Sequence, residues 1–489
     1  MLKSKPARWC MNGAARASVV IAARFESAMQ DNPNATGSNT VPVEAATVSP
    51  AAAAPPHEII VVGGGAGGIE LATRLGDTLG KRGRARVTLV DKTRTHLWKP
   101  LLHTVAAGSM DPSEVERNYL AQAHLHHFNY RFGEMIGLDR SRQLIHVGAT
   151  FDEEGREITP TRSFRYDTLV IAVGSVTNDF GTPGVASHAI PLDTTQQAVR
   201  FNRRLVNALI HAHAQHGPVR AGQLHVAIIG AGATGTELAA ELHRTAREVI
   251  AHGLDRIDPQ RDLRIILIEA AERILPALPE RVSDASLALL RELGVDVRTG
   301  ARVSEVIPQG VRLANGDFID SELVVWAAGV KAPEFLRNLD GLETNRINQI
   351  VVLPTLQTTG DPNIFAMGDC AEAPREGFDA PVPPRAQAAH QQATHLAKQF
   401  RRRLDGKPLE PYIYRDFGSL VSFGNYSTVG NLMGFLIGRN FFIEGYFAKL
   451  MYRSLHFMHE RALYGFWKAS LRWLAHGLTH QTGPTVKLH

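Results

Sequence analysis

The chain has 489 residues, 44% of them hydrophobic and 21% charged, so it can bury two or three cores of ordinary size. Its two cysteines, Cys10 and Cys370, form no CxxC pair or Cys/His cluster, which argues against a disulfide framework, an iron–sulfur cluster or any metal site. The net charge of +5 comes from the two ends, residues 1–56 and 440–489, and this does not match the broad basic face of a nucleic-acid-binding protein.

Residues 1–56 differ in composition from the rest of the chain. Five basic residues precede the first acid, Glu26, and the segment then becomes rich in Ala, Pro, Ser, Thr and Asn, with nothing to fill a core. It is either a targeting segment, because it is basic and at first free of acids, or a disordered extension. We favour the extension, since Met29 would serve equally well as an initiator.

The first folded segment predicts a strand, a glycine turn and a helix. The β-branched run EIIVV at 58–62 leads into Gly63, Gly65 and Gly68, spaced as GxGxxG at the start of a helix-periodic stretch. Glycines in this pattern permit the tight turn, the approach of a pyrophosphate and close helix packing. The next strand, ARVTLVD, ends on Asp91, whose carboxylate can bind a ribose diol. The order of these elements predicts a dinucleotide site.

The same pattern recurs downstream. LHVAII at 224–229 precedes Gly230, Gly232 and Gly235, and the strand LRIILIE ends on Glu269. A carboxylate at the ribose would repel the 2′-phosphate of NADP, and no Arg follows Glu269, so NADH is the expected nucleotide. Two such units predict one resident flavin and one transient nicotinamide, arranged for hydride transfer between their rings.

Three later segments support a flavin in the first unit. TLQTTGDPNIFAMGDCAE at 355–372 resembles the second FAD motif of the two-dinucleotide-binding flavoproteins, in which the Asp after Gly contacts the ribityl chain. LVIAVGS at 169–175 and LVVWAAGV at 323–330 resemble the backbone crossovers of the same superfamily. The candidate contacts in these segments are Gly174, Gly368 and Asp369 for FAD and Gly329 for NADH.

Five segments identify a narrower relationship. They are HLWKPLLH at 96–103, WAAGVKAPEFL at 326–336, GLETNRINQ at 341–349, PPRAQAAHQQA at 383–393 and GSLVSFGNYSTVGNLMG at 418–434. From His57 onward the chain resembles the type II NADH:quinone oxidoreductases, particularly the bacterial respiratory NADH dehydrogenases. The resemblance implies an α/β fold with two Rossmann-like domains, a resident FAD, and NADH and membrane quinone as substrates, without proton pumping.

The resemblance also implies roles for single residues. The segment with Ala386, Gln387 and Gln391 would lie beside the flavin at the quinone tunnel, and Gln387 is the expected partner of a quinone carbonyl. Lys99 and Pro100 would lie against the isoalloxazine, and Glu237 near the nicotinamide and flavin. Phe417 departs from the charged residue that many relatives carry there, so no quinone-binding role is transferred to it.

Each of these residues also has a structural explanation. Gln387 and Gln391 could bridge buried backbone groups, and His390 is expected to pack or to form a hydrogen bond. Glu237 is expected in the first turn of its helix, where the macrodipole favours a carboxylate. Cys370 is expected to be a small buried residue.

The C-terminal segment predicts an amphipathic helix over 447–475. Apolar residues recur there at helical intervals among basic ones, no acid follows Glu460, and Trp467 and Trp473 are typical of a membrane interface. The alternative is a helix docked on the body or on a second subunit, which leaves a homodimer open. No apolar run reaches 18 residues, so no transmembrane helix is expected.

The expected organisation has five parts. They are an extension (1–56), the first part of an FAD domain (57–190), an NADH domain (191–349), the second part of the FAD domain with the quinone motif (350–400) and a membrane-associating domain (401–489). The expected location is the cytoplasmic side of a bacterial inner membrane, or the mitochondrial inner membrane if the extension is a transit peptide. The rival functions are an NADH-dependent reductase of a small redox protein and a flavin-bound NADH sensor or scaffold.

Overall fold

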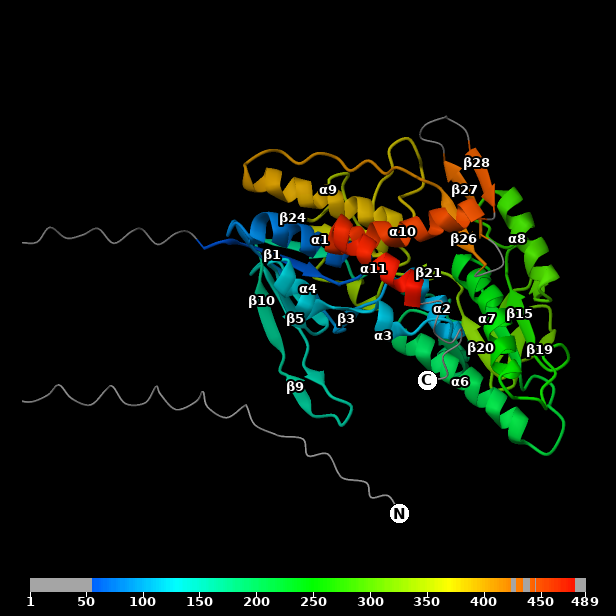
Figure 1. The fold of residues 1–489 in the computed structure, drawn as a ribbon. Helices are drawn as coiled ribbons and strands as arrows, with labels where there is room; N and C mark the ends of the chain where they lie inside the picture. The colour runs from blue at the N-terminus through cyan, green and yellow to red at the C-terminus, as the bar shows by residue number, and fades with distance from the viewer. Residues whose placement is uncertain (1–54, 424–427, 434–439, 445, 480–489) are drawn as a thin grey trace, which may run out of the picture. The chain divides into compact units, whose positions relative to one another are not determined.

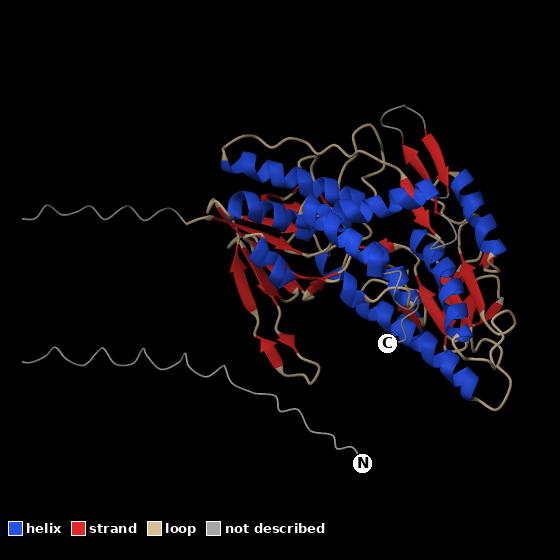
Figure 2. Ribbon diagram, in the orientation of Figure 1, coloured by secondary structure: helices blue, strands red, loops and turns tan. Residues whose placement is uncertain are grey.

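A computed structural model describes residues 55–423, 428–433, 440–444 and 446–479, with side chains described for 55–423 and 454–475. Two sheets form the framework of this part of the chain, and helices cover them (Figures 1 and 2). The fold is therefore α/β with two Rossmann-like halves, as predicted. Most of the predicted extension, with Cys10, lies outside the described residues.

The first sheet combines strands from two distant parts of the chain. Five of its neighbouring strands run parallel, and β23 pairs antiparallel at one edge. The order is β23 (Gln357–Thr358), β24 (Asp361–Ala366), β11 (Thr168–Ile171), β1 (His57–Val62), β2 (Ala85–Asp91) and β5 (Asn129–Phe132). Because β24 pairs with β11, the segment after residue 356 returns to the half that begins at His57.

The second sheet is entirely parallel. Its order is β13 (Ala189–Pro191), β20 (Leu323–Trp326), β14 (His225–Ile229), β15 (Arg264–Ile268) and β16 (Asp296–Arg298). A two-stranded antiparallel pair, β12 (Val176–Thr177) with β21 (Val330–Lys331), joins the segments that leave the two sheets. The two predicted crossover segments therefore meet side by side.

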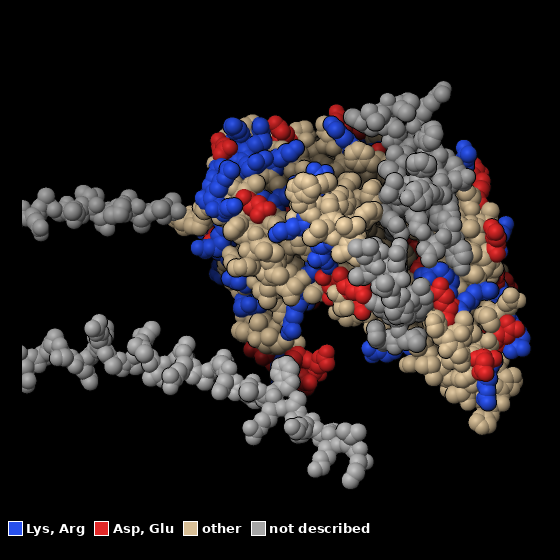
Figure 3. Space-filling model, viewed as in Figure 1, with Lys and Arg blue, Asp and Glu red and all other residues tan. Residues whose placement is uncertain are grey.

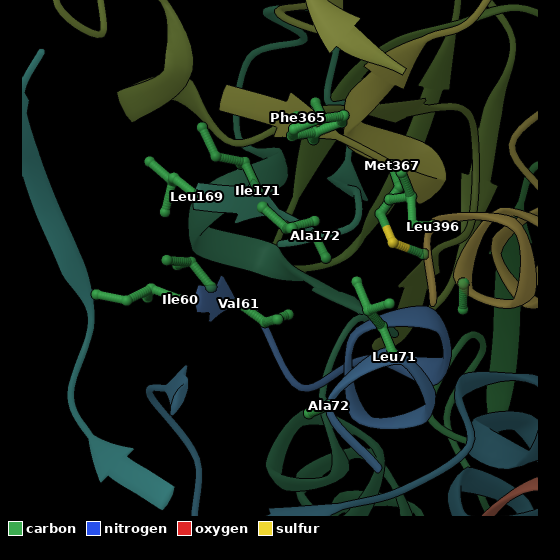
Figure 4. Packing of buried hydrophobic residues seen from close by; sticks show 14 of the residues in the cluster. Ile60, Val61, Leu71, Ala72, Leu169, Ile171, Ala172, Phe365, Met367 and Leu396 are labelled. Atoms are coloured by element: carbon green, nitrogen blue, oxygen red, sulfur yellow. The ribbon is translucent and has the colours of Figure 1, made fainter. Parts of the chain in front are cut away.

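The main core lies between the first sheet and helices α1 (Ala66–Leu75) and α9 (Ala386–Leu404), which pack on each other. Figure 4 shows buried residues of this core from close by, among them Val61 of β1, Ile171 of β11 and Phe365 of β24 from the sheet, Leu71 of α1 and Leu396 of α9. Strands buried on both faces read as continuous β-branched runs, which explains EIIVV and RIILI. Each fully buried Val, Leu or Ile contributes about 1.5–3 kcal/mol.

Smaller elements surround these layers. The other helices are α2 (Leu102–Ala107), α3 (Pro112–Val115), α4 (Tyr119–Leu125), α5 (Val185–His188), α6 (Thr195–Ala214), α7 (Ala233–Ala251) and α8 (Glu280–Glu292). Two antiparallel sheets consist of β10 (Arg162–Arg165), β7 (Leu144–Val147) and β6 (Met135–Asp139), and of β17 (Val303–Ile307), β18 (Gly310–Leu313) and β19 (Phe318–Asp320). Short pairs are β3 (Thr95–His96) with β4 (Arg117–Asn118), β8 (Thr150–Phe151) with β9 (Glu157–Thr159), and β22 (Ile350–Val351) with β25 (Ala371–Glu372).

The C-terminal part has an antiparallel sheet followed by two helices. The sheet is β26 (Ser419–Ser422), β27 (Thr428–Met433) and β28 (Asn440–Glu444), and the helices are α10 (Tyr446–Tyr464) and α11 (Phe466–Thr479). The prediction of one helix over 447–475 is wrong, because Gly465 adopts φ +77° and ends α10. Glycine reaches this left-handed conformation without a Cβ penalty, so the chain turns there.

Helix α10 is attached to the first half through buried polar groups. His459 Nε2 lies 3.0 Å from His96 Nε2, and His96 Nδ1 lies 2.9 Å from the carbonyl oxygen of Gly64. A carbonyl only accepts, so His96 carries its proton on Nδ1, and His459 Nε2–H donates to the bare Nε2 of His96. Arg117 and Glu460 form an ion pair beside this chain of bonds.

None of the helices in the described part of the chain is both long and apolar enough to cross a membrane.

The buried His96 makes stability depend on pH. Burial lowers the pKa of His96 from 6.5 to about 4, so the folded state keeps it neutral while the unfolded chain protonates it below pH 6.5. The free energy of unfolding is therefore expected to fall as pH drops from 6.5 to 4, and His96 contributes about 3 kcal/mol of this loss. Urea unfolding across this range measures it.

The variant His96→Asn tests this expectation, because Asn Nδ2 can still donate to Gly64 but does not titrate. Its stability should depend less on pH than that of the wild type. His252→Asn, which changes an exposed histidine on the C-terminal cap of α7, is the control. If His96→Asn keeps the full wild-type slope, His96 is not the group that titrates.

Candidate functional site

Both glycine turns bring a helix against the strand before it. Gly63 and Gly230 adopt φ +100° and +101° where β1 and β14 end. A Cβ on Gly68 would lie 1.8 Å from the oxygen of Gly63, and one on Gly235 would lie 2.0 Å from the oxygen of Gly230. These four glycines are therefore required by the packing of the turn itself.

The middle glycine of each motif is not required by the protein's own packing. Gly65 and Gly232 have ordinary φ values of −58° and −72°, and a Cβ on either would meet nothing within 4 Å. Each is the N-cap of its helix, α1 or α7, and no side chain caps it. The open space thus lies where N–H groups and the helix dipole favour an anion, which fits a dinucleotide pyrophosphate in each half.

The acids that end β2 and β15 bind their own turns in the same way. Asp91 Oδ2 accepts from the N–H of Gly64 at 2.5 Å, and Oδ1 accepts from Thr93 N at 2.7 Å. Glu269 accepts from the N–H groups of Ala231 at 2.7 Å and Ala271 at 2.9 Å. Asp91 Oδ1 also accepts from Thr93 Oγ1 at 2.6 Å. A carboxylate has about four acceptor positions, so Asp91 retains about one and Glu269 about two for a ribose diol.

Tyr119 is a part of the first turn that the sequence patterns did not indicate. Its buried hydroxyl donates to the carbonyl oxygen of Gly64 at 2.8 Å, beside the bond from His96. A Cβ at Gly64 would lie 2.3 Å from that hydroxyl. The Tyr119 side chain therefore binds the turn through the carbonyl oxygen of Gly64 and leaves no room for a side chain at Gly64, the second glycine of the GGG sequence.

The predicted flavin contacts after the first crossover lie together. Lys99 Nζ donates to the carbonyl oxygen of Ser175 at 2.7 Å, and Ser175 Oγ donates to Asp369 Oδ2 at 2.8 Å. Burial raises the pKa of Asp369, while the Ser175 bond and the Lys99 charge oppose that rise. Gly174 precedes Ser175, with φ +71°, and Pro100 follows Lys99 in the 3-10 turn Lys99–Leu101.

Gln392, which the sequence patterns did not indicate, binds the segment that resembles the second FAD motif. Gln392 Oε1 accepts from the N–H of Gly368, which has φ +72°, at 2.7 Å. Gln349 Nε2 donates to the backbone carbonyl oxygen of Asp369 at 2.8 Å. Cys370 is buried, its thiol donates to backbone oxygens, and burial raises its pKa to about 11, so it is the inert small residue expected.

The glutamines of α9 bind the loop at residues 415–418, which we call the strap. Gln387 Nε2 donates to Gly418 O at 3.0 Å, and its Oε1 accepts from Phe417 N at 3.3 Å. Gln391 Nε2 donates to Arg415 O at 2.8 Å and its Oε1 accepts from Arg415 N at 3.0 Å. Both side chains therefore make the backbone bridges that the sequence left as their alternative role.

One N–H of Gln387 is held less tightly than the other. An amide nitrogen carries two N–H groups. Among the described residues, the only acceptor near Gln387 Nε2 besides Gly418 O is Asp416 Oδ1, at 3.4 Å. Ala386 and Gln387 also begin α9, where the first N–H groups have no intrahelical partner. Donors are thus available where α9 starts.

His390 joins a buried carboxylate on α1. Its Nδ1 lies 2.8 Å from Oε2 of Glu70, which is fully buried, and Arg74 Nη2 binds the other oxygen at 2.6 Å. Glu70 thereby links the first glycine helix to the helix of the quinone motif. The hydrogen-bonding role expected for His390 is present.

Glu237 does not lie in the first turn of its helix, so the expectation of a dipole-stabilised carboxylate there is wrong. Helix α7 begins at Ala233, and Glu237 lies one turn further in and is buried. Its Oε1 accepts from Ser422 N at 2.9 Å, and its Oε2 lies 3.5 Å from Nδ1 of His103. Burial lowers the pKa of His103 to about 4, so this histidine is neutral at pH 7.

Gly329 lies on the second crossover with φ +65°, and its carbonyl oxygen accepts from Asn178 N at 3.3 Å. It thus lies at the junction of β12 and β21, beside the residues that follow Gly174. The candidate contacts of the two halves converge at this junction.

Comparisons with known proteins agree with this geometry. The family model of the pyridine nucleotide-disulphide oxidoreductases matches residues 57–393. A type II NADH:quinone oxidoreductase from Haemophilus influenzae is 42% identical over 437 residues, covering 87% of this chain and 98% of the relative. The type II NADH:quinone oxidoreductase Ndh of Mycobacterium tuberculosis is 30% identical over 405 residues, covering 80% of this chain and 81% of the relative.

A solved structure shows the same fold. NDH2 from Plasmodium falciparum, determined in complex with NADH, superposes with a TM-score of 0.73 over 88% of this chain and 100% of that chain, at 19% identity.

The two middle glycines provide a test of nucleotide binding that spares the fold. Gly65→Ala should fold normally, because its Cβ meets only open space, but should lose bound flavin. Gly232→Ala should keep the flavin and raise the KM for NADH by roughly tenfold, as expected for about 1.4 kcal/mol of lost binding. Flavin absorbance and steady-state kinetics measure these effects. Normal flavin content in Gly65→Ala would contradict the assignment of the first turn.

Proposed function

The chain belongs to the type II NADH:quinone oxidoreductases, within the pyridine nucleotide-disulphide oxidoreductase family, and from this we infer that it oxidises NADH and reduces a quinone through bound FAD. The observation that carries this inference is the pair of glycine turns in which a Cβ at Gly65 or Gly232 would meet nothing within 4 Å. Hydride transfer between a nicotinamide and a flavin requires two dinucleotide sites in one protein, and the two turns are built in the same way.

The FAD site is proposed in the half built from 57–190 and 350–400. Gly63, Gly65 and Gly68 with the N-terminus of α1 would hold the pyrophosphate, and Asp91 the ribose. Six further residues would line the ribityl chain and the ring of the cofactor: Lys99, Pro100, Gly174, Gly368, Asp369 and Ala386. Their support is the bonded cluster of Lys99, Ser175 and Asp369, which lies next to the start of α9.

The NADH site is proposed in residues 191–349. Gly230, Gly232 and Gly235 would hold the pyrophosphate, and Glu269 the ribose diol of the adenosine. Gly329 at the crossover would face the nicotinamide end. A carboxylate at Glu269 supports NADH over NADPH, since the 2′-phosphate would meet a like charge.

When bound, FAD accepts a hydride from NADH and passes two electrons to the quinone. The chain's own part is to orient the rings, exclude other acceptors and place donors for the quinone. The loosely held N–H of Gln387 is the proposed donor to a quinone carbonyl, with Gln391 holding the strap behind it. Glu237 is the proposed carboxylate beside the nicotinamide and flavin.

Residues 401–489 are proposed to meet the membrane, because quinone is lipid-soluble. Helix α11 supports this, since Trp467 is 83% exposed and Leu471 is 72% exposed in the described part of the helix. We propose peripheral association on the cytoplasmic side of a bacterial inner membrane, with the mitochondrial inner membrane as the alternative for a targeted precursor. The alternative is that a second subunit covers α11. A dimer in detergent would favour this alternative, and a monomer would favour contact with the membrane.

Gln387→Ala should lower kcat/KM for a short-chain ubiquinone by about tenfold, the cost of one hydrogen bond, without affecting flavin reduction by NADH. Gln391→Ala removes the same kind of bridge to the strap and is the matched control, with a smaller effect expected. Steady-state rates with the quinone and with a soluble artificial acceptor separate the steps. Equal losses in both variants would assign Gln387 to the strap alone.

Glu269→Gln should reduce the preference for NADH over NADPH, measured as the ratio of kcat/KM values, by roughly tenfold or more, because the repulsion of the 2′-phosphate disappears. The amide oxygen can still accept from Ala231 N, so the variant should fold. An unchanged ratio would contradict the placement of Glu269 at the ribose.

A further inference from the structure

A hollow of about 440 Å³ lies between α1, α9 and the turn that joins α10 to α11. It is separate from the nucleotide turns and from the strap. Arg74 of α1, Lys398 and Arg401 of α9, and Arg461 of α10 line it. Three distant segments of the chain thus bring four cations to one hollow.

These cations are largely uncompensated. Within the part of the chain that the structure describes, no carboxylate lies within ion-pair distance of Lys398, Arg401 or Arg461, whereas Arg74 binds the buried Glu70. The one acidic side chain among the described lining residues is Asp77, which contacts His126 Nδ1 at 3.0 Å. The hollow therefore has a positive potential that suits an anion.

A buried hydroxyl in the same wall lacks a partner. Thr394 lines the hollow from α9, and its Oγ1 is buried without a hydrogen bond to any described group. Gly465 also lines the hollow, directly before the first N–H groups of α11.

An exposed apolar stripe begins at the edge of the hollow. Trp467, Leu471 and Leu474 follow the i, i+4, i+7 spacing of one helical face and are 83%, 72% and 61% exposed. Arg461 of the hollow lies over the ring of Phe466, 6.0 Å from its centroid, so the cations and the stripe adjoin. Figure 3 shows Lys and Arg gathered over α9 beside an uncharged area over α10 and α11.

We propose that this hollow binds the phosphodiester headgroup of an anionic phospholipid, with the acyl chains lying along the stripe of Trp467, Leu471 and Leu474. The size supports a headgroup over a free phosphate, because one water takes about 30 Å³ and the hollow is many times larger. The adjoining stripe supports a lipid over a soluble anion. This inference rests on the membrane association proposed above and adds a selectivity for lipid charge.

The direct test adds water-soluble short-chain phosphatidylglycerol to the purified holoenzyme and follows its melting temperature, since a ligand of the folded state raises it. Short-chain phosphatidylcholine and inorganic phosphate are the comparison ligands. A rise with phosphatidylglycerol alone is expected. An equal rise with phosphatidylcholine, or an equal rise with inorganic phosphate, would overturn the proposal of an anionic lipid site.

The double variant Lys398→Gln/Arg401→Gln should bind phosphatidylglycerol about 30-fold more weakly, the effect of two cations at an anionic surface. Arg203→Gln/Arg204→Gln, which removes two exposed cations from α6, is the matched control and should bind as the wild type does. Unchanged binding in the first variant would overturn the site, and so would an equal loss in both.

Membrane association and turnover are read separately. Trp467→Ser should reduce sedimentation with both neutral and anionic vesicles, whereas the Lys398/Arg401 variant should lose the anionic preference alone. All variants should oxidise NADH with a soluble acceptor at the wild-type rate. Failure of the wild type to bind any vesicle would overturn both the lipid site and the membrane association, while its NADH oxidation would still test the enzyme function independently.

Discussion

The close approach of each glycine helix to its strand is the constraint on which the molecule depends. Gly68 and Gly235 lie so near the oxygens of Gly63 and Gly230 that no side chain fits. This packing places the helix N-terminus at the carboxyl end of the sheet and leaves space at Gly65 and Gly232. In the proposed sites, nucleotide recognition needs little beyond a terminal acid, because backbone N–H groups and the helix dipole supply the anion site.

The same turn is connected to the C-terminal helices. The carbonyl oxygen of Gly64 accepts from both Tyr119 and His96, and His96 in turn accepts from His459 of α10. Glu70, on the helix that the turn begins, binds His390 of the quinone motif. The half proposed to hold the flavin, the helix α9 and the segment proposed to meet the membrane are therefore joined by buried polar contacts, whose geometry is costly to disturb.

Short-range patterns in the sequence predicted the elements whose structure depends on neighbouring residues alone. The strands β1 and β2, both glycine turns and the acids Asp91 and Glu269 follow from β-branched runs and glycine spacing. The partners of Asp369 and Gly368, which are Ser175 and Gln392, come from other segments and carry no signal of their own. The break at Gly465 was missed because the apolar period continues through it, although a glycine within that period was the available signal. Glu237 was misplaced by one turn because the helix start was not fixed by a cap.

Anaerobic rapid mixing of the purified holoenzyme with NADH and then with a short-chain ubiquinone tests the central claim most directly. If the two nucleotide halves serve electron transfer to quinone, the flavin absorbance should bleach with NADH and return when the quinone is added, in the absence of oxygen. Bleaching by NADH without any return on adding quinone would contradict the assignment and favour a protein acceptor or a sensor.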